Sequence, residues 1–197
     1  MKKQILSIAI LILISSTANF AQTVEQQVTK IRNLYAATNK RIDKGIKEKT
    51  AGLHYAMWTV GGERDGQQWS AVGTMETRDE IWFDGEPDPE GGVEDVRKLV
   101  RKIVSSYKGA AGIHTRSEYL FNENGELLFA YSSNDTAGED GTRVEEKFYF
   151  AKGKLIRVVR DGKNVDAKFS AKDFEKATGE SENGKRARNK FAIMFAE

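Results

Sequence analysis

Residues 143–160 read RVEEKFYFAKGKLIRVVR, and this stretch indicates how the chain folds. Two runs rich in β-branched and aromatic residues flank Ala151-Lys152-Gly153, a three-residue loop whose final glycine suits the left-handed bulge position of a hairpin. Such a hairpin pairs Phe148 with Ile156. Its predicted buried face carries Phe148, Phe150, Ile156 and Val158. Its predicted water-facing side carries Arg143, Glu145, Lys147 and Arg157.

The same pattern of short strands and short turns continues upstream of this hairpin. Residues 113–121 and 126–132 read as two strands, and Glu123-Asn124-Gly125 between them is a second three-residue loop that ends in glycine. With the strands at 143–150 and 155–160, they predict a meander of four consecutive strands.

Two earlier strands are predicted in an aromatic-rich part of the chain. Residues 52–61 are bounded by glycines and are apolar on both alternating faces, which is typical of a strand covered on both sides. A turn-rich segment leads into a second strand at 68–76, which is continued or bulged through Ile81, Trp82 and Phe83.

Helical periodicity appears in three parts of the chain. Spacings that alternate between four and three predict a helix over 23–47 and a second over 93–108. The first of these carries a buried stripe of Val24, Val28, Ile31, Tyr35, Thr38, Ile42 and Ile46. Ser170 and Asp173 resemble a capping box that starts a short helix. A last helix over 185–197 is expected to bury Phe191, Met194 and Phe195.

The order of elements is therefore helix, two strands, helix, four strands and helical tail. Strands that follow one another through short connections favour antiparallel pairing. The sequence predicts an α+β fold with a curved antiparallel sheet of about six strands, and with the helices packed on one face of the sheet.

The first 21 residues read as a secretory signal peptide. Lys2 and Lys3 precede an apolar run over 5–14 that is too short to span a bilayer, and a stretch of small and polar residues follows it. Cleavage is expected after Ala18 or Ala21. Residues 22–197 are then predicted to be a single globular domain that is exported to the periplasm or the extracellular space, with no integral membrane segment.

Charge and composition exclude several functions. The 197 residues include 31 basic and 29 acidic residues, and removal of Lys2 and Lys3 with the signal leaves 29 of each. A nucleic-acid-binding protein usually carries a basic excess, so no nucleic-acid partner is expected. The chain has no cysteine, which excludes a disulfide, a thiol nucleophile and a cysteine-ligated metal.

No catalytic motif stands out. The glycine-flanked serine of hydrolases, the zinc-binding helix and the phosphate-binding loops are absent, and no catalytic residue, metal ligand or cofactor is predicted. His54 and His114 sit in similar contexts, after Ala-Gly-Leu and Ala-Gly-Ile, but they are expected to be structural. A catalytic pair of carboxylates is left open, because 29 acidic residues allow many pairs and spacing selects none.

All three tryptophans lie in the first predicted strand pair and its extension. We predict a ligand-binding, aromatic-lined face of the sheet built from Tyr55, Trp58, Trp69 and Trp82. The predicted function is a non-catalytic binding or interaction module of the cell envelope, with an apolar or glycan-like small ligand or an envelope protein as its partner. One alternative is a carboxylate-based hydrolase acting on polysaccharide. Another is an inhibitor or assembly factor for an envelope protein.

Overall fold

The computed structural model describes residues 23–48, 52–61, 75–86, 92–109, 113–135, 143–165 and 168–195. The predicted signal peptide and Trp69 lie outside these residues, so neither prediction is tested by the structure.

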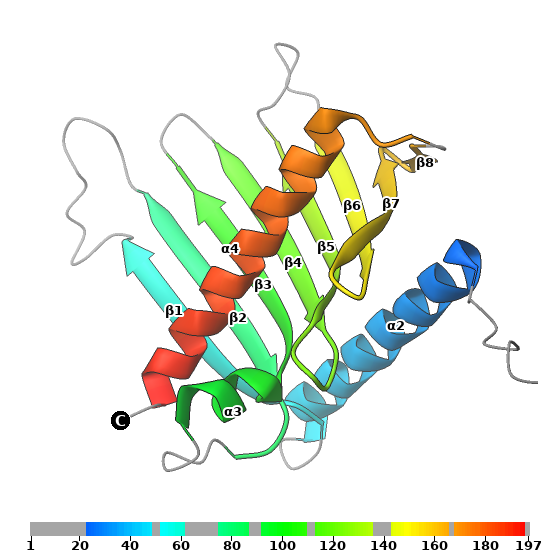
Figure 1. Ribbon diagram of the computed structural model, residues 1–197. Coiled ribbons are helices and arrows are strands. Elements are labelled where there is room, and N and C mark those ends of the chain that lie inside the picture. The colour runs from blue at the N-terminus through cyan, green and yellow to red at the C-terminus, as the bar shows by residue number, and fades with distance from the viewer. Residues whose placement is uncertain are drawn as a thin grey trace, which may run out of the picture.

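One antiparallel sheet organises the described residues (Figure 1). Its eight strands follow the chain order without a crossover. They are β1 (His54–Gly61), β2 (Glu76–Phe83), β3 (Val100–Lys108), β4 (His114–Phe121), β5 (Leu127–Asn134), β6 (Val144–Ala151), β7 (Lys154–Arg160) and β8 (Lys163–Asn164). The predicted four-strand meander is confirmed as β4 to β7, and β3 and β8 raise the strand number above the predicted six.

The second predicted helix, over 93–108, is confirmed in its first half and wrong in its second half. Helix α3 (Gly92–Leu99) ends where β3 begins, and β3 pairs with β2 on one side and β4 on the other. Adjacent β3 residues are buried on opposite faces, with Ile103 in one core and Lys102 against Tyr35 on the other side. Because a strand buried on both faces has apolar residues at many spacings, this segment also fits a helical period.

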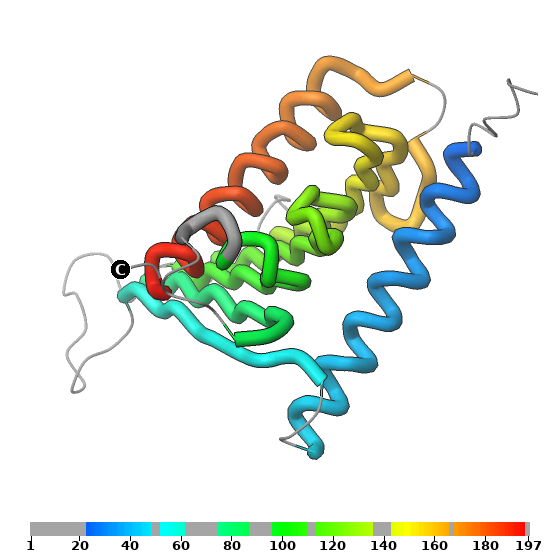
Figure 2. Tube along the Cα trace, turned by 60° about the horizontal axis from the view of Figure 1, so that its bottom comes forward, coloured from blue at the N-terminus to red at the C-terminus, as the bar shows by residue number. Residues whose placement is uncertain are grey.

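The helices cover both faces of the sheet, which corrects the prediction that they pack on one face. Helix α4 (Ala171–Phe195) and α3 lie on one side and α2 (Val24–Glu48) on the other (Figure 2). Adjacent residues of β4 enter the two separate cores, Tyr119 the α4 side and Leu120 the α2 side. None of the described helices is long and apolar enough to cross a membrane.

The C-terminal part forms one helix rather than the predicted two. Its start confirms the predicted capping box: the backbone N–H of Ser170 donates to Asp173 Oδ2 at 2.8 Å, and the backbone N–H of Asp173 donates to Ser170 Oγ at 3.2 Å. The hydrogen bonds from Ser170 lower the pKa of Asp173 to about 2. Phe191 is fully buried as predicted, while Met194 and Phe195 are partly buried.

The predicted register of the last hairpin is wrong. Lys152 and Gly153 both have positive φ, 50° and 71°, and form a two-residue turn between the paired residues Ala151 and Lys154. A bulge follows, so that Phe148 faces Val158 rather than Ile156. Ile156 therefore packs against the α2-side core, on the opposite face from Phe148.

Two glycines inside α4 provide a matched test of its packing. A Cβ at Gly184 would lie 2.9 Å from Cδ1 of Tyr119, whereas a Cβ at Gly179 would meet no heavy atom within 4 Å. We expect Gly184→Ala to lower the free energy of unfolding by about 1–3 kcal/mol through overpacking. We expect Gly179→Ala to raise it by about 0.5–1 kcal/mol, because alanine favours the helix. Urea unfolding measures both, and stabilisation by both variants would contradict the close packing at Gly184.

Candidate functional site

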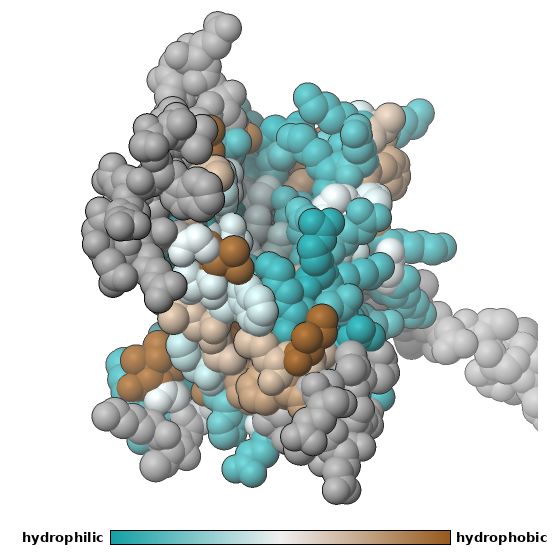
Figure 3. Space-filling model, turned by 90° about the vertical axis from the view of Figure 1, so that its left-hand side faces the viewer, coloured by the Kyte–Doolittle hydropathy of each residue, from teal (hydrophilic) through white to brown (hydrophobic). Residues whose placement is uncertain are grey.

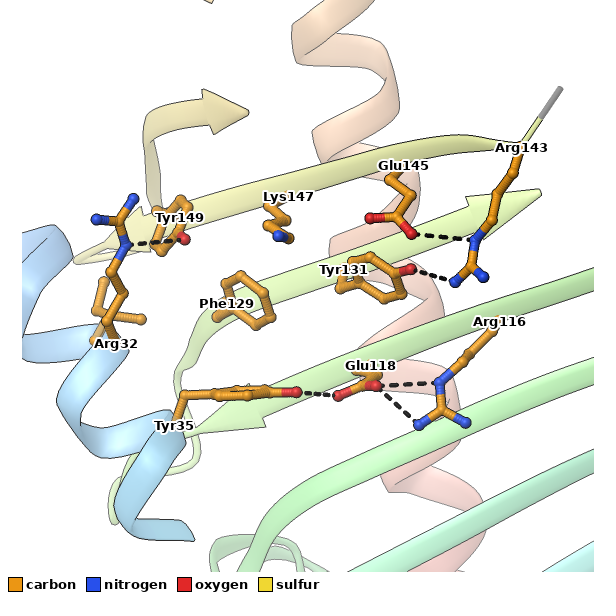
Figure 4. Close-up of a pocket in the computed structure, with 11 residues that line it drawn as sticks. Arg32, Tyr35, Arg116, Glu118, Phe129, Tyr131, Arg143, Glu145, Lys147 and Tyr149 are labelled. Carbon is orange, nitrogen blue, oxygen red and sulfur yellow. Dashed lines mark hydrogen bonds and ion pairs between the residues drawn. The ribbon is translucent and has the colours of Figure 1, made fainter. Parts of the chain in front are cut away.

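A cleft of about 540 Å³ lies between α2 and the sheet face formed by β4, β5 and β6 (Figure 4). Its volume falls within the range of about 300–1,000 Å³ that is common for small-molecule sites. Helix α2 contributes residues spaced by three and four, and each strand contributes alternate residues of one face. The lining consists of Ile31, Arg32, Tyr35, Arg116, Glu118, Phe129, Tyr131, Arg143, Glu145, Lys147 and Tyr149.

Aromatic rings form the inner wall of this cleft. The centroids of Tyr35 and Phe129 lie 5.3 Å apart, and those of Phe129 and Tyr149 lie 5.2 Å apart, both in edge-to-face geometry. Tyr131 extends this surface along β5 toward the outer end of the cleft (Figure 4). The wall therefore joins the helix to two strands, with Phe129 and Tyr149 buried and Tyr35 and Tyr131 only half-buried at its surface.

A buried charge network supports one side of the cleft. Lys102 Nζ lies 2.7 Å from Glu118 Oε2, the Tyr35 hydroxyl donates to the same oxygen at 2.5 Å, and Arg116 bonds the other oxygen at 2.8 Å. The side chains of Lys102 and Glu118 are only 7% and 10% exposed. Burial alone would raise the pKa of Glu118, but the hydrogen bonds from Lys102 and Tyr35 outweigh it and hold this pKa below its ordinary value.

Cations outnumber anions around the opening. Arg32, Arg116, Arg143 and Lys147 line the cleft together with only two carboxylates, Glu118 and Glu145. Arg143 is held at 2.9 Å from the Tyr131 hydroxyl and at 3.1 Å from Glu145. Arg32 donates to the Tyr149 hydroxyl at 3.4 Å. These bonds keep two of the guanidinium groups against tyrosines of the wall.

Lys147 differs from the three arginines. It projects from β6 between Tyr131 and Tyr149 (Figure 4). Among the residues that the structure describes, no carboxylate lies within ion-pair distance of its ammonium group and no acceptor is hydrogen-bonded to it. The cleft thus presents a cation beside aromatic rings.

The predicted aromatic residues do not line this cleft. Tyr55 and Trp82 lie side by side on paired positions of β1 and β2, with ring centroids 5.5 Å apart. Trp58 is three residues from Tyr55 on the same strand and so faces the opposite side of the sheet. The structure therefore brings two of the four predicted residues together, and their role in ligand binding stays a prediction.

Sequence reasoning missed the aromatic residues of the cleft. Tyr35 was placed on a buried stripe, and Tyr131 and Tyr149 were given no role beyond their strands. The available signal was the alternation of tyrosines with charged residues on the strand face opposite the predicted core. That signal becomes specific only when α2 is known to cover this face.

The edge of the sheet exposes further apolar side chains. Tyr55, Met57 and Val60 on β1 are 50%, 49% and 55% exposed, and β1 is the first strand of the sheet. Figure 3 views the molecule from this side and shows hydrophobic residues at the surface among hydrophilic ones.

The two histidines lie far apart. His54 pairs with Phe83, which pairs with Val100 at the start of β3, whereas His114 pairs with Lys108 at the end of β3. They therefore occupy opposite ends of the sheet. Among the described residues, no group of three or more histidine, aspartate or glutamate side chains is arranged to hold a metal ion.

Comparison with known proteins indicates no function for this chain. No protein-family model, no curated protein and no solved structure matches this chain.

Proposed function

We propose that this protein is an exported, non-catalytic binding protein whose cleft between α2 and the sheet takes a small ligand with an anionic group and a flat apolar body. The observation that carries the proposal is the ammonium group of Lys147, which lacks a counter-ion among the described residues and lies beside an aromatic wall. Export rests on the signal-like character of residues 1–21.

The chemistry of the cleft supports this ligand class. The half-buried rings of Tyr35 and Tyr131 offer apolar area, and burial of a flat group against them is favourable by about 25 cal/mol per Å². An anionic group on the ligand would act as the counter-ion that the Lys147 ammonium group lacks among the described residues. A hydrogen bond that involves a charged group contributes about 1.5–3 kcal/mol, so this contact favours anionic over neutral ligands.

The contacts of Glu118 favour binding over hydrolysis in the α2 cleft. Glu118 in the cleft is held by Lys102, Tyr35 and Arg116, which keep it ionised and occupy both of its oxygens. A general acid needs a raised pKa and a free path to the substrate, and Glu118 has neither.

A docking function for another protein would use a different surface. The half-exposed Tyr55 and Met57 on edge strand β1 favour this second candidate. The α2 cleft supports small-ligand binding better, because it is concave and combines apolar walls with placed charges.

Paired dyes test the small-ligand proposal. We expect the sulfonate dye 1-anilinonaphthalene-8-sulfonate to bind with one-to-one stoichiometry, and at least about tenfold more tightly than the uncharged N-phenyl-1-naphthylamine. Lys147→Met should weaken the sulfonate dye by about tenfold and leave the uncharged dye unchanged, because only the charge contact is lost. Fluorescence titration measures both affinities.

Lys154→Met provides the matched control for this titration. Lys154 begins β7, is exposed and does not line the cleft. This variant should bind both dyes as the parent protein does. Equal losses of sulfonate binding in the two lysine variants, or no loss in Lys147→Met, would overturn the proposed site.

A further inference from the structure

A polar row crosses the opposite face of the sheet, beneath α4. In the observed register, Asp79 pairs with Ser105, Ser105 with Ser117, Ser117 with Ser132, Ser132 with Glu146 and Glu146 with Arg160. Directly paired residues of an antiparallel sheet share one face. The row therefore places three serines between two charged ends, next to the apolar core on the same face.

The charges at the first end of the row are balanced. Lys190 of α4 lies 2.7 Å from Asp79 Oδ2, and Ser105 Oγ donates to Asp79 Oδ1 at 2.6 Å. Both oxygens of this nearly fully buried carboxylate are thus occupied. The Asp79 carboxylate is therefore already paired within the protein.

The charges at the second end are balanced as well. Arg160 Nε lies 2.7 Å from Glu146 Oε1, and Lys176 Nζ lies 2.5 Å from Glu146 Oε2. Arg160 also pairs with Asp173 at 2.8 Å. Two cations and two carboxylates close this end, and both oxygens of Glu146 are engaged.

Glu180 faces the middle of the row from α4. The Tyr119 hydroxyl donates to Glu180 Oε2 at 2.9 Å, and no lysine or arginine of the described residues forms an ion pair with this carboxyl. Burial raises the pKa of Glu180 above its ordinary value. Its second oxygen faces the hydroxyl-lined middle of the row and can accept a hydrogen bond from a ligand.

A cavity of about 490 Å³ opens between these groups and α4. Its size lies in the range of small-molecule sites. Gly179 leaves space on the helix side, where a Cβ would meet nothing within 4 Å. The lining is rich in hydroxyl and amide groups and consists of Thr115, Ser117, Ser132, Ser133, Asn134, Val144, Glu146, Phe148, Lys176, Gly179, Glu180 and Asn183. A smaller cavity of about 200 Å³ adjoins it and shares Thr115, Ser117 and Asn183.

We propose that this second cavity binds a neutral, hydroxyl-rich ligand of the size of a mono- or disaccharide. The hydroxyls of Thr115, Ser117 and Ser132 and the Asn183 amide can each donate and accept, as the hydroxyls of a sugar can. The buried carboxylates at both ends, Asp79 and Glu146, are already paired with cations of the protein. A neutral polyol fits this lining better than an anion or a cation.

This site is independent of the α2 cleft. The two cavities lie on opposite faces of the sheet and share no lining residue. Both can therefore be blocked separately by substitution.

Calorimetric titration with glucose, galactose, mannose, maltose and lactose tests the second site. We expect at least one of these sugars to bind with one-to-one stoichiometry. Gly179→Leu should weaken that sugar at least about tenfold, because the added side chain fills the cavity, while leucine favours the helix and preserves the fold. Glucuronate and glucosamine should bind no more tightly than the neutral sugars.

Two controls separate this site from the dye site. Lys185→Leu adds the same side chain at an exposed position of α4 and should leave sugar binding unchanged. Lys147→Met should also leave it unchanged, and Gly179→Leu should leave dye binding unchanged. The second site would be overturned if none of the neutral sugars binds at concentrations up to about 50 mM. It would also be overturned if Gly179→Leu does not affect the binding observed. Neither result bears on the first site.

Discussion

Glu118→Leu is expected to lower the free energy of unfolding by about 3–5 kcal/mol. The substitution leaves the Lys102 ammonium buried, and the partners that remain to it among the described residues are the Asn39 side chain at 2.8 Å and the Tyr35 hydroxyl at 3.2 Å. It also removes the acceptor of the Tyr35 hydroxyl, which ties α2 to the sheet. Urea unfolding followed by circular dichroism measures the loss.

The double variant Lys102→Met/Glu118→Leu is the control for this prediction. Replacing both members of a buried ion pair by apolar side chains is often neutral or stabilising, because no charge is left without a partner. We therefore expect the double variant to regain most of the stability lost in Glu118→Leu. If it is as unstable as the single variant, the loss comes from packing at this position and not from an unpaired charge.

Phe191→Ala is expected to cost a similar amount, about 3–5 kcal/mol. Phe191 is fully buried, and its ring centroid lies 4.7 Å from that of Phe83 and 4.8 Å from that of Phe195. Truncation leaves a cavity between α4 and β2 that neighbouring rings can fill only in part. Urea unfolding measures this loss as well.

Ile193→Ala is the matched control two residues further along α4. Ile193 is 69% exposed, so its truncation should change the free energy of unfolding by no more than about 0.5 kcal/mol. Comparable losses in the two variants would show that the effect belongs to the helix end as a whole, and would contradict a specific core role for Phe191.

Elements with a strong local signal were predicted correctly. The first helix was recognised from its stripe, of which Val28, Ile31, Thr38 and Ile42 are buried. The capping box at Ser170 and Asp173 was recognised because its two hydrogen bonds join residues only three positions apart. Both features depend on the spacing of residues within one helix, which the order of residues defines directly.

Elements that depend on distant neighbours were not predicted correctly. Residues 100–108 form a strand because β2 and β4 pair with them on both sides, although their spacing also fits a helix. The last hairpin has a different register from the predicted one, because Lys152 adopts positive φ and a bulge follows. Ile156 therefore lies on the other face of the sheet. A one-residue shift in strand pairing costs little free energy within the hairpin itself. The packing of both sheet faces therefore selects the register.

The candidate sites show the same division. The tryptophan-rich strands suggested an aromatic surface, but β-sheet alternation places Trp58 opposite Tyr55 and Trp82. The cleft beside Lys147 exists because α2 packs across β4 to β6, and the serine row exists because the register aligns residues from separate strands.

The order of residues alone determined the helix caps, the α2 stripe, the four-strand meander and the neutral charge of residues 22–197, since these depend on neighbours in the chain or on composition. The tertiary structure decided which face each helix covers, which residues stand opposite one another across the sheet, and therefore where the cavities open. Those features arise from packing between segments tens of residues apart, and a period of two or of three to four residues does not specify them.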